Sequence, residues 1–220
     1  TRRSKKVDAV AGVMPERTAV VLAGGRSTRF GDEDKAVADL AGAPMIRRVV
    51  DRVAPAVDAV VINCRAAQRE AIAAALDGAA VPVTFAEDDY PDEGPMAGMA
   101  TGLRAVESEY AFVVACDMPF VDPGFVDYLF ERAAGHDAAV PRPEQWFETT
   151  HAVYRAAAMV EACEAALAEG EERIVAPLFD LDFVVVDADE VRDHGVPHTF
   201  ENCNTRADFE DAARRLEKRS

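Results

Sequence analysis

Short apolar runs alternate with amphipathic segments along the first 134 residues, and this alternation restricts the fold more than any other feature of the sequence. Each run is rich in β-branched residues and ends near a glycine, a proline or a polar residue, as buried strands do. The runs that predict strands are residues 18–23, 58–64, 81–86 and 110–116. Segments with helical spacing of apolar residues follow them. Such alternation produces right-handed crossovers, so we predict an α/β fold with a mainly parallel sheet and helices on both faces.

Beyond residue 134 the pattern is less regular. It predicts strands at 151–154, 183–186 and 199–203, and helices at 156–169, at 173–181 and from Asp208 onward. No internal repeat, linker or low-complexity tract divides the chain, and a chain of this length buries roughly 70% of its unfolded surface in one core. We therefore expect one domain over residues 17–220, with residues 1–16 as a disordered extension.

The net charge excludes several classes of function. A formal charge of −16 disfavours binding to nucleic acids and to anionic membranes. No apolar run reaches the roughly 18 residues that span a bilayer, so no membrane segment is predicted. The four cysteines are isolated from one another, which is typical of a reducing compartment rather than of a disulfide or zinc scaffold. We expect a cytoplasmic protein.

The basic residues comprise 20 Arg and only 4 Lys. Together with the acidic excess, this composition suggests a surface adapted to concentrated salt, in which the Debye length falls to about 3 Å and self-repulsion is screened. A codon bias toward Arg and Ala would produce a similar composition, so this alternative stays open.

A basic, glycine-containing segment directly follows the first predicted strand. Residues 22–31 read LAGGRSTRFG, and Asp34 and Lys35 come shortly after. Glycines at such a position let backbone N–H groups approach a phosphate, and Arg26, Arg29 and Lys35 add cations to an acidic chain. The spacing matches neither G-x-G-x-x-G nor G-x-x-x-x-G-K-[ST]. The segment therefore favours an anion-binding loop of another kind over an ordinary turn with solvated basic residues.

Lys35 is the only lysine between residues 7 and 217. Because arginine supplies nearly every other cation, a compact ammonium here indicates a position that needs a point charge rather than a planar fork. Lys35 is therefore a candidate functional residue.

Asp117 follows the fourth predicted strand, in the sequence CDMPF at 116–120. The carboxyl ends of strands in an open α/β sheet line the crevice in which ligands bind. Mg²⁺ typically takes one or two protein carboxylates and completes its shell with phosphate oxygens and water. Asp117 is therefore a candidate metal ligand, the alternative being an aspartate that only begins the following turn.

Polar or glycine residues also follow the other predicted strands. Asn63 ends the second strand, Asp88 follows the third, and GPMAGM at 94–99 opens the next helix, whose free N–H groups suit an anion. Asn202 and Asn204 are two residues apart, so on an extended segment they would face the same side. We expect these residues to line one cleft, although Asn is as common in a turn before a helix. No nucleophile paired with a base is recognisable, so covalent catalysis is not predicted.

In order along the chain, these motifs resemble the molybdenum cofactor guanylyltransferase family, also called molybdopterin-guanine dinucleotide biosynthesis protein A. The similarity extends over nearly everything after Pro15. Its segments are LAGGRSTRFG at 22–31, DK at 34–35, VVINC at 60–64, AED at 86–88, GPMAGM at 94–99, CDMPF at 116–120, HAVYR at 151–155, GEERI at 170–174 and NCNT at 202–205. The resemblance implies a Rossmann-like nucleotidyltransferase domain that transfers GMP from Mg-GTP to the phosphate of molybdopterin and releases pyrophosphate.

The resemblance also implies roles for individual residues. Lys35, Asp117 and Arg29 would act in catalysis, and Asp117 would hold Mg²⁺. The residues implied to contact the nucleotide are Leu22, Ala23, Gly24, Gly25, Lys35, Asn63, Asp88, Gly94 and Asp117. Those implied to contact the acceptor are Gly98, Asn202 and Asn204.

Three alternative functions stay open on the sequence. A cytidylyltransferase for molybdopterin, and a guanylyltransferase for another phosphorylated acceptor such as a corrinoid precursor, share this fold and these motifs. A non-catalytic subunit that delivers cofactor to a molybdoenzyme is disfavoured by Asp117 and Lys35, because binding alone rarely needs a metal carboxylate. The expected partners are GTP and molybdopterin, with transient contact to a molybdoenzyme or a cofactor-insertion protein.

Overall fold

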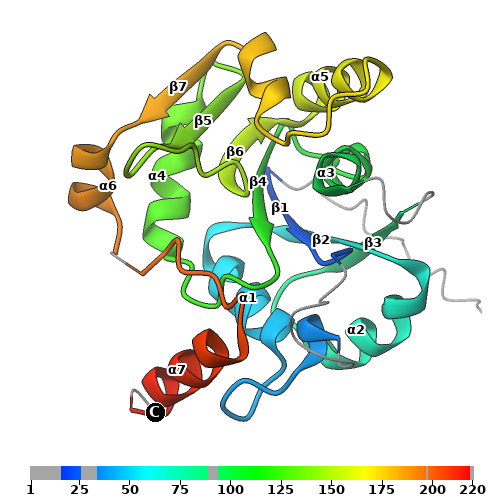
Figure 1. Cartoon of the computed structure of the whole chain (residues 1–220), viewed down its shortest axis with the longest axis vertical. Coiled ribbons are helices and arrows are strands. Elements are labelled where there is room, and N and C mark those ends of the chain that lie inside the picture. Colours follow the sequence, from blue (N-terminus) through cyan, green and yellow to red (C-terminus); the bar gives the residue numbers. More distant parts are fainter. Residues whose placement is uncertain (1–15, 26–33, 89–93, 197, 219–220) are drawn as a thin grey trace, which may run out of the picture.

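A seven-stranded sheet forms the centre of the computed structural model, which describes residues 16–25, 34–88, 94–196 and 198–218 (Figure 1). The strands are β1 (Arg17–Leu22), β2 (Ala59–Cys64), β3 (Val83–Glu87), β4 (Tyr110–Ala115), β5 (Ala138–Pro141), β6 (His151–Arg155) and β7 (Phe183–Val186). Their order across the sheet is β3-β2-β1-β4-β6-β5-β7. Within this sheet, β6 is antiparallel to β4 and β5, and all other neighbours are parallel. The predicted mainly parallel sheet is confirmed.

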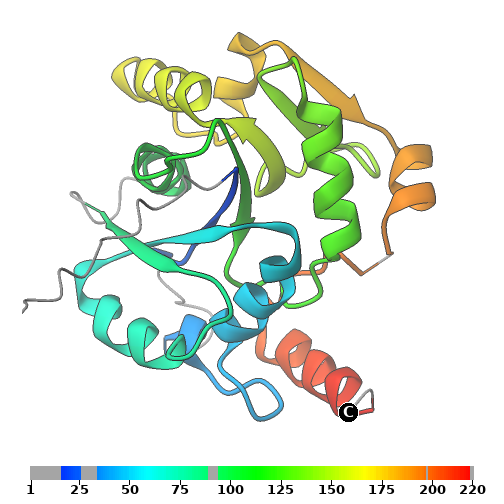
Figure 2. The same cartoon turned by 180° about the vertical axis from the view of Figure 1, so that it is seen from behind.

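Helices cover both faces of this sheet, as Figures 1 and 2 show. The described α-helices are α1 (Met45–Val53), α2 (Arg69–Ala75), α3 (Gly94–Arg104), α4 (Pro123–Ala133), α5 (Ala156–Ala168), α6 (Ala188–His194) and α7 (Arg206–Glu217). Helices α1, α2 and α4 pack on the face that receives Ala19 and Val21 of β1. Helices α3 and α5 pack on the opposite face, with Val20. Successive β1 residues thus pack into the cores on opposite faces of the sheet, as expected for a strand that is buried on both faces.

Helix α7 packs on a small core of its own. It buries Ala212 and Leu216 together with Leu40, Phe120 and Cys203. Thr205 caps the helix, because its Oγ1 accepts a hydrogen bond from Asp208 N at 3.2 Å. This core ties the C-terminal helix to Phe120, in the segment that follows β4.

Two predicted elements are wrong. Residues 199–203 form no strand, because turn-type bonds such as Glu201 N to His198 O replace a sheet ladder there. The helix predicted at 173–181 is only the short 3₁₀-helix η4 (Ala176–Asp180). Pro177 lacks the N–H that an α-helical ladder needs, and Arg173 N donates to the Glu171 carboxylate at 2.9 Å.

Strand β5 and helix α6 are present although the sequence did not predict them. β5 is a four-residue strand that contains two alanines and ends in Pro141, and neither residue type favours a strand. Pairing with β6 and β7 on its two sides stabilises it in the fold. Residues 1–15 of the predicted N-terminal extension lie outside the described residues, and no described helix is long and apolar enough to cross a bilayer.

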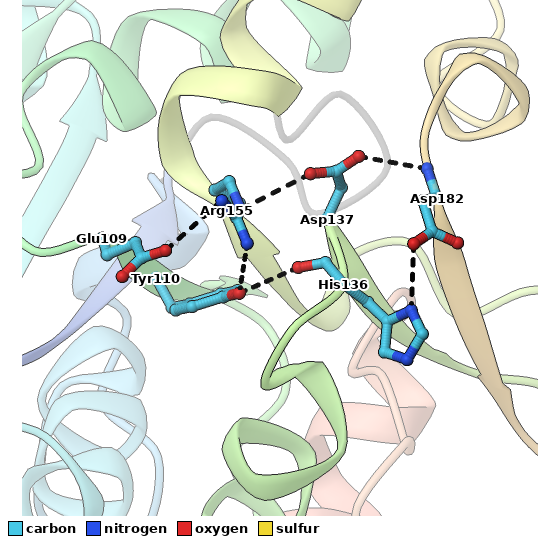
Figure 3. A network of polar contacts seen from close by, with 6 residues as sticks. All are labelled: Glu109, Tyr110, His136, Asp137, Arg155 and Asp182. Atoms are coloured by element: carbon cyan, nitrogen blue, oxygen red, sulfur yellow. Dashed lines mark hydrogen bonds and ion pairs between the residues drawn. The ribbon is translucent and has the colours of Figure 1, made fainter.

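A polar network joins the antiparallel strand β6 to its neighbours (Figure 3). Arg155, the last residue of β6, donates from Nη2 to Tyr110 Oη at 2.8 Å, and Tyr110 Oη donates to the carbonyl of His136 at 2.9 Å. Arg155 also lies 3.4 Å from Glu109 Oε1 and 3.4 Å from Asp137 Oδ1. Because Tyr110 begins β4, this network lies at the amino ends of the parallel strands. The carboxyl ends, where ligands bind in such sheets, lie at the opposite edge.

Candidate active site

The carboxyl ends of β1, β2, β3 and β4 meet at one edge of the sheet. Backbone hydrogen bonds continue beyond the strands: Ala23 N donates to Asn63 O at 2.8 Å, and Cys116 N donates to Leu22 O at 3.0 Å. Asp88 N donates to Cys64 O at 2.9 Å. The predicted residues after each strand are therefore neighbours, as expected for an open α/β sheet.

Lys35 and Asp117 form a buried ion pair at this edge. Lys35 opens the 3₁₀-helix η1 (Lys35–Val37), and Asp34 caps that helix by accepting from Ala36 N at 3.1 Å. Lys35 Nζ lies 2.6 Å from Asp117 Oδ2, and the two side chains are only 10% and 17% exposed. A positive charge held against a carboxylate with little water nearby is favourable for binding an anion together with a divalent cation.

Asn63 and Asp88 form a second polar pair beside the glycine segment. Asn63 is 2% exposed, and its Nδ2 donates to Asp88 Oδ1 at 2.6 Å and to Ala86 O at 3.3 Å. A Cβ on Gly24 would lie 2.5 Å from Asp88 Oδ2, and a Cβ on Gly98 would lie 2.6 Å from Asn63 Oδ1. A side chain at position 98 would therefore displace the buried Asn63 carboxamide, and one at position 24 would push the Asp88 carboxylate aside.

The acceptor candidates lie next to Asp117. Cys203 N donates to Asp117 O at 2.9 Å, so residues 202–204 run alongside the end of β4. Asn202 and Asn204 are exposed on either side of the buried Cys203. Their side chains are therefore available to a ligand at this edge.

Other predicted residues are placed differently. Gly25 and Gly94 are exposed, and Gly94 begins α3 with a positive φ of 87°. Gly98 is buried against Asn63 rather than open to solvent. Arg26 and Arg29 lie outside the described residues.

The thiols near the edge are unsuited to nucleophilic chemistry. Burial, with the neighbouring Asp117 carboxylate, raises the pKa of Cys116 far above its usual value. Burial raises the pKa of Cys203 to about 12. Both thiols are therefore neutral at physiological pH, and neither is an activated nucleophile.

The donor set at this edge would suit Mg²⁺ held jointly with a nucleotide. Within the described ranges, no cluster of three or more His, Cys, Asp or Glu side chains could hold a metal ion without other ligands. Asp117 presents one carboxylate, and its Oδ2 accepts a hydrogen bond from Lys35 Nζ. Mg²⁺ commonly binds one or two carboxylates together with substrate phosphates, so a single carboxylate beside an ammonium fits it.

Gln68 contributes to the site although the sequence reasoning did not select it. It belongs to the 3₁₀-helix η3 (Ala66–Gln68) and is 4% exposed. Its Nε2 donates to Ala23 O at 3.0 Å and to Asp34 Oδ2 at 2.7 Å. In the sequence, Gln68 is a single amide side chain in an alanine-rich segment, five residues after Asn63. Such a residue does not by itself indicate a function.

Known proteins are similar to this chain in sequence and in fold. A family model described as a MobA-like NTP transferase domain matches residues 19–195. A probable molybdenum cofactor guanylyltransferase of Natronomonas pharaonis is 54% identical over 92% of this chain and 100% of its own length. A protein of the same description from Haloferax mediterranei is 42% identical over 86% of this chain and 89% of its own. The crystal structure of molybdopterin-guanine dinucleotide biosynthesis protein A from Archaeoglobus fulgidus superposes with a TM-score of 0.76 at 28% identity, covering 91% of this chain and 99% of that one.

Proposed function

This chain belongs to the molybdenum cofactor guanylyltransferase family, and we propose that it transfers GMP from GTP to the phosphate of molybdopterin, releasing pyrophosphate. The observation that carries this proposal is the contact of Lys35 Nζ with Asp117 Oδ2 at the carboxyl edge of the sheet. This contact supports the proposal because an ammonium beside a carboxylate suits a nucleotide phosphate bound together with Mg²⁺, on a chain whose net charge of −16 would otherwise repel a nucleotide.

The reaction requires alignment of two anions more than it requires a nucleophilic side chain. An oxygen of the acceptor phosphate forms a bond to the α-phosphorus of GTP. The bond from that phosphorus to the bridging oxygen breaks, and its electron pair leaves with pyrophosphate. Because the attacking phosphate is already an anion at neutral pH, the protein need not supply a base.

The residues at the edge divide this task between them. Lys35 neutralises negative charge on the nucleotide phosphates, and the backbone at Gly24 and Gly25 allows their close approach. Asp117 would hold Mg²⁺, which when bound supplies Lewis-acid stabilisation and a template for the phosphates. Arg29 is proposed to assist, and Asn202 and Asn204 to orient the acceptor.

The Asn63–Asp88 pair supports guanine as the base. Asn63 Nδ2 donates to Asp88 Oδ1 at 2.6 Å and so helps to orient the carboxylate. A carboxylate accepts hydrogen bonds from two adjacent N–H donors, and the guanine edge offers N1–H beside its 2-amino group. Cytosine offers one amino donor beside a ring nitrogen that is itself an acceptor. This chemistry favours GTP over CTP.

The further context of the reaction is proposed on family grounds. We expect a cytoplasmic enzyme whose small-molecule partners are GTP and molybdopterin. Transient contact with a molybdoenzyme or a cofactor-insertion protein would deliver the product.

Incubation of the purified protein with Mg²⁺, either GTP or CTP, and either molybdopterin or a corrinoid precursor tests the proposal. GMP incorporation with release of pyrophosphate is the expected result. Incorporation of CMP alone would overturn the assignment of the base. Transfer of GMP only to a corrinoid precursor would overturn the assignment of molybdopterin as the acceptor. Binding of GTP without any transfer would indicate a subunit that delivers the cofactor.

Replacement of Asp117 should abolish most of the activity while the fold persists. We expect Asp117→Ala to lower kcat by at least about a hundredfold, equivalent to roughly 2.7 kcal/mol of transition-state stabilisation. The matched control is Asp51→Asn, which removes the charge of an exposed carboxylate that pairs with Arg47 on α1. Turnover of Asp117→Ala within a few-fold of the wild type would contradict the assigned role.

A further inference from the structure

We propose that Gln68 is a positioning residue for nucleotide transfer. Its carboxamide joins the end of β1 to the turn that carries Lys35. This inference rests on the proposed function, because it concerns how the backbone before Gly24 and the turn that carries Lys35 are held for the same triphosphate.

Every hydrogen-bonding group of the Gln68 carboxamide is used. Nε2 donates to Ala23 O at 3.0 Å and to Asp34 Oδ2 at 2.7 Å. Oε1 accepts from Arg65 N at 3.1 Å and from Arg65 Nε at 3.0 Å. A buried carboxamide with four satisfied partners has a fixed orientation, so it also fixes the groups that it contacts.

The two acceptors of Nε2 lie on either side of Gly24 and Gly25 in the sequence. Ala23 immediately precedes Gly24, and its carbonyl lies beyond the last residue of β1. Asp34 immediately precedes Lys35. Gln68 therefore links the residue before Gly24 to the residue that begins the turn of η1.

Contacts continue from Asp34 to the ion pair. While Oδ2 of Asp34 accepts from Gln68, its Oδ1 accepts from Ala36 N at 3.1 Å and so closes the turn of η1. Lys35, within that turn, reaches Asp117 Oδ2 at 2.6 Å. The orientation of the Lys35 ammonium thus depends on a side chain that has no contact with Lys35 or Asp117 in the described structure.

Only a carboxamide of this length satisfies the arrangement. A glutamate at position 68 would set a carboxylate against the Ala23 carbonyl and the Asp34 carboxylate, and all three are acceptors. A methionine would match the length but would leave the Ala23 carbonyl and Asp34 Oδ2 without their donor. A buried polar group without a partner is costly, so the turn would shift to find one.

Gln68→Met tests this role, with Ile72→Val as the matched control. Ile72 is fully buried on α2, the helix that follows Gln68 directly, and its truncation lowers stability without touching the site. Mg-GTP binding is measured by calorimetry, and kcat and KM are measured for GTP and for molybdopterin. We expect Gln68→Met to weaken Mg-GTP binding and to lower kcat/KM for GTP by about tenfold each, as loss of a buried hydrogen-bond partner implies. The KM for molybdopterin should change less than about twofold. Ile72→Val should match the wild type in its Mg-GTP affinity, its kcat/KM for GTP and its KM for molybdopterin.

A reversed pair provides a rescue. Gln68→Glu should be at least as damaging as Gln68→Met, whereas the double variant Asp34→Asn/Gln68→Glu restores the hydrogen bond with donor and acceptor exchanged. We expect the double variant to bind Mg-GTP at least about threefold better than Gln68→Glu alone. Should Gln68→Met fail to fold, Gln68→Asn, which keeps the carboxamide but is shorter, carries the same expectation.

The outcomes separate this proposal from the proposed function. If the wild type binds Mg-GTP and Gln68→Met binds it equally well, the role of Gln68 is overturned while the enzyme assignment stands. A loss equal to that of Ile72→Val would also overturn it, because a general loss of stability would then suffice. If the wild type binds Mg-GTP but transfers nothing, the enzyme assignment fails and the binding comparison still decides for or against Gln68. Absence of Mg-GTP binding to the wild type would overturn both.

Discussion

His151 shows how a single buried residue can join a strand to a distant segment of the chain. Its ring, at the start of β6, is enclosed by Phe112, Phe125 and Phe200. Its Nε2 lies 3.2 Å from Thr199 Oγ1, which also accepts from Asp122 N at 3.0 Å. Burial lowers the pKa of His151 to about 3, so the ring is neutral in the folded protein. The neutral imidazole thereby connects β6 to the segment that leads to Asn202 and Asn204.

This lowered pKa predicts a specific loss of stability in acid. Below pH 6.5 the unfolded chain protonates His151 while the folded chain does not, so the free energy of unfolding falls until the folded pKa near 3 is reached. We expect a contribution of about 1.4 kcal/mol per pH unit within this window, and none above it. Urea unfolding of the wild type and of His151→Gln at pH 7.5, 6 and 5 isolates this contribution. Parallel pH profiles for the two proteins would show that His151 titrates normally.

At the scale of elements, the close approach of α3 to the sheet holds the Asn63 side chain in place. Two glycines on this helix face the sheet: a Cβ on Gly102 would lie 2.5 Å from Val20 Cγ1, and a Cβ on Gly98 would lie 2.6 Å from Asn63 Oδ1. Without them the helix could not lie so close to β1 and β2. Its closeness keeps the Asn63 side chain in the position from which it donates to Asp88.

Gly98→Ala should therefore weaken nucleotide binding even though alanine favours a helix. The added methyl group would displace the Asn63 carboxamide, and overpacking of this kind costs about 1–3 kcal/mol. If nucleotide binding requires the present position of Asn63, that cost lowers the Mg-GTP affinity by about fivefold or more. Gly124→Ala, on the first turn of α4, is the control, because its Cβ would lie 3.5 Å from the nearest side-chain atom, in ordinary contact. Calorimetric titration with Mg-GTP compares the two. An unchanged affinity for Gly98→Ala would mean that Asn63 has room to move.

At the scale of the whole molecule, the charge of −16 sets the conditions under which the fold is stable. Like charges on the surface repel one another at low ionic strength, and salt screens that repulsion. The buried Lys35–Asp117 pair is protected from this screening, because both side chains are largely inaccessible to water.

The melting temperature should therefore rise as KCl is increased from millimolar to molar concentration. Each kcal/mol gained corresponds to about 2–4 °C for a domain of this size. Sucrose at equal osmolality is the control, because it adds no ions. Equal melting temperatures in low and molar KCl would favour codon bias as the origin of the Arg-rich, acidic composition.

The sequence by itself determined the class of fold and the residues at the strand ends. Runs such as 18–23 and 110–116 are long enough, apolar enough and rich enough in β-branched residues to predict β1 and β4 without knowledge of their partners. Because the carboxyl ends of parallel strands share an edge, Asn63, Asp88 and Asp117 could also be grouped in advance.

The tertiary structure alone decided how those residues meet. The Lys35–Asp117 contact joins residues 82 positions apart, and the Gln68 contact with Ala23 joins residues 45 apart. No local pattern specifies such pairs, because they depend on sheet order and on the seating of each helix. For the same reason β5, with its alanines and Pro141, forms a strand only between two neighbours. Residues 199–203 resemble a strand in sequence but do not join the sheet. They lie beside Asp117, whose carbonyl accepts a hydrogen bond from Cys203 N.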